Sequence, residues 1–152
     1  MARIKLQEQP CYEFTYEIAV QARDLSSRGH LGSDAIVQIL HEAVVNMFRA
    51  LGLSETDLGD GRTGIISGDT VVNFKTEAYL FDNLSVESHI DEIAPDGFRV
   101  FHRVSRTGKL IALVETGLIG FDYTTRAIAP IPQEFNRALL QYSQGLQRTC
   151  SS

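Results

Sequence analysis

The pattern of apolar and polar residues predicts one strand and one long helix in the first third of the chain. Apolar and polar side chains alternate over residues 12–20, and this period of two is typical of a half-buried strand. Residues 23–33 are rich in Gly, Ser and Asp, which indicates a loop. We expect a helix over residues 34–51, with Ser33 as its N-cap and Gly52 as its C-cap. Apolar residues recur on most sides of this helix, so we expect it to be largely buried.

The rest of the chain predicts four strands in succession and a terminal helix. The strands are residues 63–78, 84–93, 98–105 and 110–121, with Pro-Asp-Gly and Thr-Gly turns between the later ones. Short turns between consecutive strands require an antiparallel sheet. We predict a single α+β domain over residues 1–152 in which that sheet wraps around the long helix, with its core at about 12–136 and a last helix at about 132–147.

Composition narrows the possible functions. The chain has 152 residues, which suits one domain, and a formal net charge of -5, which argues against binding nucleic acid. The N-terminal residues lack the apolar segment of a secretion signal, and no apolar run is long enough to span a bilayer. We therefore expect a cytoplasmic protein with no membrane partner.

Several familiar motifs fail on spacing. His41-Glu42 begins like HExxH, but Val45 stands where the second histidine is required, so we expect no zinc site. Gly64 to Gly68 resembles the GxSxG turn of serine hydrolases, but its serine, Ser67, is one place too late. The sequence predicts no metal and no cofactor.

One segment gathers residues suited to acyl chemistry. Asp24 and His30 precede the long helix, residues 32–34 open it, and Glu42 lies further along it. The first backbone amides of a helix are unpaired and carry partial positive charge, so they can stabilise a carbonyl oxygen that becomes negative. Thioester hydrolysis also needs a carboxylate, either as nucleophile or as a base that activates water. Asp24 and Glu42 both meet that need, and the sequence leaves the choice between them open.

The segment RDLSSRGHLGSDAIVQILHEA resembles the loop and helix of the hot-dog thioesterase superfamily, in its 4-hydroxybenzoyl-CoA and acyl-ACP thioesterase branches. VVNFKTEAYLFDNLSVESHI and the closing RTGKLIALVETGLIGFDYTTRAIAPIPQEF are similar to later strands of the same family. The resemblance implies a hot-dog fold that forms a homodimer or a dimer of dimers, with active sites between subunits. It implies an acyl-CoA or acyl-carrier substrate, so that coenzyme A is part of the substrate.

The resemblance also assigns roles to residues. The catalytic carboxylate matches Asp24 or Glu42. Gly29 and His30 match the loop that meets the thioester, with His30 as a third predicted catalytic residue and Gly29 as a predicted substrate-binding residue. The helix start is expected to hold the carbonyl, a strand is expected to face the helix across a dimer, and a hairpin is expected to contact the CoA phosphates. The predicted substrate-binding residues are Gly32 and Ser33 at the helix start, Ser67, Gly68 and Thr70 on the strand, and Arg103 and Arg106 on the hairpin. An ordinary structural role is the alternative for each.

Two other functions remain open. A hot-dog dehydratase or hydratase would use a histidine in a proline-containing loop, and the loop around His30 has no proline. A non-catalytic acyl-binding protein would have the same fold, because a fold does not determine a function. Thioester hydrolysis is the function that the sequence favours.

Overall fold

The structure, a computed structural model, describes residues 2–150, and their side chains as far as Leu146. Its strands form one antiparallel sheet with the order β1-β3-β4-β5-β2, and a short β6 pairs with β5. The strands are β1 (Phe14–Ala19), β2 (Thr63–Phe74), β3 (Asn83–Ala94), β4 (Gly97–Arg106), β5 (Lys109–Asp122) and β6 (Ala127–Ile128). The helices are the short η1 (Ala22–Asp24), the long α1 (Ser33–Ala50) and α2 (Gln133–Cys150). This arrangement confirms the predicted α+β fold.

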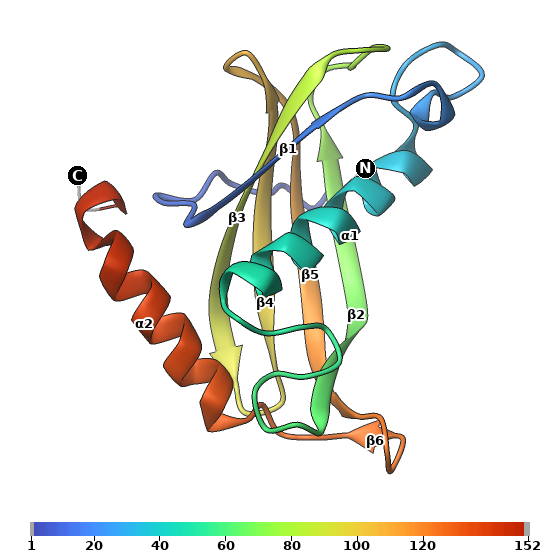
Figure 1. The fold of residues 1–152 in the computed structure, drawn as a ribbon. Coiled ribbons are helices and arrows are strands. Elements are labelled where there is room, and N and C mark those ends of the chain that lie inside the picture. Colours follow the sequence, from blue (N-terminus) through green and yellow to red (C-terminus); the bar gives the residue numbers. More distant parts are fainter. Residues whose placement is uncertain (1, 151–152) are drawn as a thin grey trace.

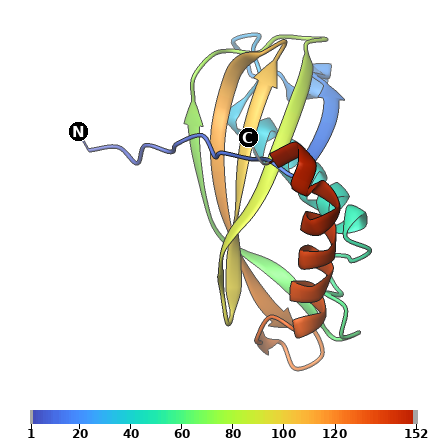
Figure 2. The same ribbon diagram turned by 90° about the vertical axis from the view of Figure 1, so that its left-hand side faces the viewer.

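Figures 1 and 2 show how the layers are arranged. The curved sheet wraps part of the way around α1, and α2 packs beside the end of the sheet on the same side as α1. No helix within residues 2–150 is both long and apolar enough to cross a bilayer.

The core lies between α1 and the concave face of the sheet. One face of α1 is buried, and its members recur every three or four residues: Ala35, Ile36, Ile39, Leu40, Ala43, Val44, Met47 and Phe48. Phe135 of α2 is fully buried and stacks on Phe98 of β4, with ring centroids 4.6 Å apart. Burying a large apolar side chain of this kind stabilises the fold by roughly 1.5–3 kcal/mol.

The prediction that the long helix is buried nearly all round is wrong. Val37 and Val45 are 48% and 42% exposed, and with Glu42 they form a surface face of α1. The physical reason is that the sheet can cover only one side of α1. The other side stays exposed even where its residues are apolar. The helix also begins one residue early, at Ser33, so its N-cap is Gly32 and not Ser33. At its other end Leu51 is the C-cap, and Gly52 follows with a left-handed φ of 74°.

The core also holds one polar pair. Ser88 of β3 and His102 of β4 are neighbours across the sheet, and the hydroxyl of Ser88 lies 2.7 Å from Nδ1 of His102. His102 is 1% exposed, and its other ring nitrogen, Nε2, has no hydrogen-bond partner among the described residues. Burial lowers the pKa of His102 to about 3, so the ring is neutral at pH 7.

Candidate active site

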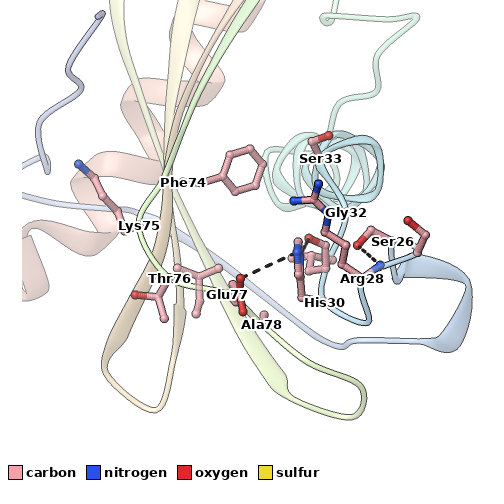
Figure 3. Close-up of a pocket in the computed structure, with 13 residues that line it drawn as sticks. Ser26, Arg28, His30, Gly32, Ser33, Phe74, Lys75, Thr76, Glu77 and Ala78 are labelled. Carbon is pink, nitrogen blue, oxygen red and sulfur yellow. Dashed lines mark hydrogen bonds and ion pairs between the residues drawn. The ribbon is translucent and has the colours of Figure 1, made fainter.

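A cavity of about 490 Å³ opens in front of the first turn of α1. Most of its walls come from two segments that are far apart in the sequence: the loop 26–33 before α1, and residues 74–78 at and after the end of β2. Ile111 of β5 completes the lining. Figure 3 shows Phe74 pointing from β2 toward the start of α1, with His30 and Glu77 facing each other below it. We call this space the front cavity.

Backbone hydrogen bonds fix the loop that forms one wall. The amide of Gly32 donates to the carbonyl of Asp24 (2.9 Å), and the amide of Ser26 donates to the carbonyl of His30 (2.8 Å). The amide of Leu31 donates to the carbonyl of Ala78 (2.7 Å), which ties this loop to the segment after β2. The loop is therefore held in place before any substrate binds.

The first turn of α1, which begins at the cavity with Ser33, has backbone amides without an intrahelical partner. The N–H groups of Ser33, Asp34 and Ala35 precede the first intrahelical hydrogen bond, which is made by the amide of Ile36. Within the described part of the chain no side chain caps them, because the N-cap residue Gly32 has none to offer. A cap of this kind leaves these amides available to an oxygen of a ligand.

His30 lies beside these amides with a defined orientation. Its Nδ1 is 3.1 Å from the carbonyl of Leu31, so the Nδ1–H tautomer donates there and leaves the lone pair of Nε2 free. Nε2 lies 3.9 Å from Oε1 of Glu77, which is close enough for an ion pair when the ring is protonated. The carboxylate of Glu77 is also fixed, because the hydroxyl of Tyr79 donates to its Oε2 (2.7 Å).

The other two predicted catalytic residues lie elsewhere. Asp24 is buried, does not line the front cavity, and accepts a hydrogen bond on Oδ2 from the amide of Gln21 (2.8 Å). Its carboxylate therefore stabilises the turn before the loop. Glu42 is exposed on α1, nine residues after Ser33, and is thus about 13 Å further along the helix axis. Within one chain the structure brings neither carboxylate to His30.

The predicted substrate-binding residues are divided between several places. Gly32 and Ser33 line the front cavity, whereas Gly29 is exposed at a turn of the loop with a φ of 81°. Ser67 and Thr70 line a second cavity of about 480 Å³, further along α1 and β2. Gly68 lies between them at an irregularity in the pairing of β2 with β5.

The two predicted phosphate-binding arginines are already paired. Arg103 makes ion pairs with Glu87 (2.8 Å) and Glu8 (3.3 Å). Arg106 makes an ion pair with Asp82 (2.6 Å) in the turn before β3. Neither arginine lines the front cavity or the second cavity.

Sequence reasoning missed Glu77. The apolar pattern extended the predicted strand to Ala78, but the strand ends at Phe74, and Glu77 turns toward the loop. Glu77 is 47 residues from His30, and no local pattern indicates that the two would meet.

The comparisons with known proteins identify the family. Residues 20–139 match the model of the thioesterase-like superfamily. The chain belongs to that superfamily. One relative is a 1,4-dihydroxy-2-naphthoyl-CoA hydrolase of Synechococcus elongatus, 22% identical over 123 residues that cover 80% of this chain and 90% of the relative.

Solved structures of similar proteins share the fold. A 1,4-dihydroxy-2-naphthoyl-CoA thioesterase from Synechocystis superposes with a TM-score of 0.74 at 24% identity, over 84% of this chain and 95% of that chain. A protein from Staphylococcus aureus, solved in complex with CoA, superposes with a TM-score of 0.77 at 18% identity, over 86% and 84% of the two chains. The prediction of a hot-dog-fold member of the thioesterase superfamily is thus confirmed, and so is its enzyme class, thioester hydrolase, at the level of the family.

Proposed function

We propose that this protein hydrolyses acyl-CoA thioesters in the front cavity, with His30 as the general base. The observation that carries the proposal is the meeting of three groups there: the free amides of the first turn of α1, the free Nε2 of His30, and the carboxylate of Glu77. Superfamily membership supports the reaction, and CoA thioesters are the substrates that the names of two relatives give for those proteins.

The reaction follows from these positions. The thioester carbonyl oxygen binds at the amides of Ser33 and Asp34, which stabilise the negative charge that develops on it. Nε2 of His30 takes a proton from a water molecule as the water oxygen attacks the carbonyl carbon. The C–S bond then breaks, and the imidazolium returns the proton to the departing CoA sulfur. The products are a free acid and the CoA thiol.

Glu77 supports this step without contacting the substrate. Its carboxylate is 3.9 Å from the nitrogen that becomes protonated, so it stabilises the imidazolium when water is attacked. The hydrogen bond from Tyr79 holds the carboxylate in that position. Glu77 is therefore a positioning residue for His30.

A homodimer remains part of the proposal. β2 lies at the end of the sheet, so its outer edge is unpaired in a single chain, and Phe74 at the end of β2 is 45% exposed. An unpaired strand edge of this kind is suited to pairing with a second copy. Glu42 can serve a front cavity only from a second copy, because in its own chain it lies too far along α1.

The test is a free-thiol assay over a panel of acyl-CoAs with five variants. We expect His30→Gln to lower kcat about 100-fold or more, as loss of a general base does. Glu77→Gln should lower kcat less and change the pH profile, because the imidazolium loses its counter-ion. His89→Gln, on the opposite face of the sheet, is the matched control and should keep full activity.

The remaining two variants address the carboxylates that the sequence predicts as catalytic. Asp24→Asn and Glu42→Gln should keep most activity if His30 is the base. Loss of activity in either folded variant, with full activity in His30→Gln, would instead assign the reaction to that carboxylate. Thiol release by none of the proteins, wild type included, would refute the function itself.

A further inference from the structure

The front cavity has a positively charged lining in an acidic protein. Among the described residues that line it, Arg28 and Lys75 are cations and Glu77 is a carboxylate. Glu77 faces His30 and accepts a hydrogen bond from Tyr79, so its charge is already engaged. The whole chain has a formal net charge of -5, so the lining differs in sign from the molecule around it. A cleft lined mainly by one sign of charge attracts ligands of the opposite sign.

Arg28 differs from the arginines of the sheet because it has no acidic partner. Arg99, Arg103 and Arg106 each make an ion pair with a carboxylate at 2.6–2.8 Å. Within the part of the chain that the structure describes, the side chain of Arg28 makes no ion pair and no hydrogen bond, while its backbone amide donates to Oγ of Ser26 (3.2 Å). A guanidinium carries five N–H donors in a planar arrangement that matches a carboxylate. These donors of Arg28 are therefore available to an anionic ligand.

A tight turn places Arg28 beside the start of α1. The amide of Gly29 donates to the carbonyl of Ser26 (3.0 Å), and the amide of Ser26 donates to the carbonyl of His30 (2.8 Å). Arg28 is two residues from His30, and two residues span at most about 7 Å. In Figure 3 the side chain of Arg28 points from this turn toward the first turn of α1, whereas Lys75 lies across the cavity, beyond Phe74. Arg28 is thus the cation on the side of the cavity where the thioester is expected.

The phosphates of coenzyme A are too far from the thioester to be the ligand of Arg28. About thirteen bonds separate the sulfur from the first phosphorus, which corresponds to about 15 Å in an extended arm. In the proposed reaction the thioester carbonyl binds at the amides of Ser33 and Asp34, and Arg28 points toward the same turn of the helix. An anion that Arg28 binds therefore belongs to the acyl group.

We propose that Arg28 selects acyl groups with a second carboxylate, so that the preferred substrates are CoA thioesters of short dicarboxylic acids. The guanidinium binds the distal carboxylate through two parallel hydrogen bonds. Phe74 and Ile111, the apolar part of the lining, contact the methylene groups between the two ends. This inference rests on the proposed hydrolysis in the front cavity and names the substrate class of that site.

The test compares glutaryl-CoA with pentanoyl-CoA in the thiol-release assay, because the two acyl groups have the same number of carbons and only glutaryl carries a second carboxylate. We expect kcat/KM of the wild type to be about tenfold or more higher for glutaryl-CoA. Arg28→Gln should lower kcat/KM for glutaryl-CoA about tenfold or more and change that for pentanoyl-CoA less than about twofold. Arg28→Lys keeps the charge but not the planar fork and should retain part of the preference. Arg49→Gln, exposed on α1 outside both cavities, is the matched control and should behave as the wild type.

The outcomes separate the inference from the function on which it rests. If the wild type hydrolyses both substrates equally and Arg28→Gln changes neither, the inference is refuted and the function stands. An equal loss for both substrates in Arg28→Gln would also overturn the inference. S-pentanoyl-pantetheine, which has no phosphate, then identifies the cause: the loss disappears if Arg28 binds a phosphate of coenzyme A and persists if Arg28 acts on the carbonyl oxygen. If the wild type releases thiol from neither substrate, the proposed function fails. Calorimetric titration of wild type and Arg28→Gln with the two CoA thioesters then decides whether Arg28 selects a carboxylate.

Discussion

The buried Ser88–His102 pair makes the stability of this protein sensitive to acid. Burial holds the pKa of His102 at about 3, whereas the same ring in the unfolded chain titrates near 6.5. As the pH falls below 6.5 the unfolded state binds a proton that the folded state excludes, so the free energy of unfolding decreases. At pH 5 the unfolded ring lies about 1.5 pH units below its pKa, and at 1.36 kcal/mol per unit the loss is about 2 kcal/mol.

Denaturation in urea at pH 8 and at pH 5 measures this loss. The comparison variant is His102→Leu combined with Ser88→Ala, which removes both polar groups so that neither is left unpaired in the core. Subtracting the pH dependence of this variant from that of the wild type cancels the other titrating groups. We expect the wild type to lose about 2 kcal/mol more than the variant between the two pH values.

The urea comparison has one result that would refute the role of His102 and one alternative variant. Equal pH dependence of the wild type and the double variant would refute it, because His102 would then titrate alike in the folded and unfolded states. If the double variant fails to fold, His102→Gln keeps a neutral polar side chain and serves for the same comparison.

Two further predictions concern stability. Phe135→Ala removes a fully buried ring that stacks on Phe98, and it should lower the free energy of unfolding by about 3–5 kcal/mol. In a thermal scan this corresponds to a Tm lower by about 10 °C. An unchanged Tm would mean that α2 does not pack as described. Nδ1 of His89 lies 2.7 Å from the carboxylate of Glu13, and this hydrogen bond raises the pKa of His89 above 6.5. The contribution of protonated His89 to stability is therefore complete below pH 6.5. It is lost as the pH rises through the pKa that His89 has in the folded protein, which is higher than 6.5. The stability advantage of the wild type over His89→Gln should shrink from pH 6 to pH 9, and a constant difference would contradict this assignment.

The local pattern of apolar and polar residues was sufficient to predict the helices and strands and their order along the chain. The alternation over residues 12–20, the apolar positions of α1 and the short turns between the later strands all reflect contacts within a few residues of each other. The resemblance over RDLSSRGHLGSDAIVQILHEA added the family, and it placed His30 and Ser33 at the start of the helix, where the front cavity lies.

The chemistry of the site depended on contacts between distant parts of the chain. Whether a carboxylate can assist His30 is decided by which segment folds onto the loop before α1, and hydrophobic periodicity carries no information about that. The segment is the one after β2, which brings Glu77 to 3.9 Å from His30, while Glu42 turns to solvent. The sequence by itself determined a long helix that begins close after Asp24 and His30, whereas the structure showed that its N-cap is Gly32, which leaves the first amides without a side-chain cap. Only the tertiary structure decided which side chains share the space in front of them, because that depends on how the sheet curves around one side of α1 and leaves the other side open.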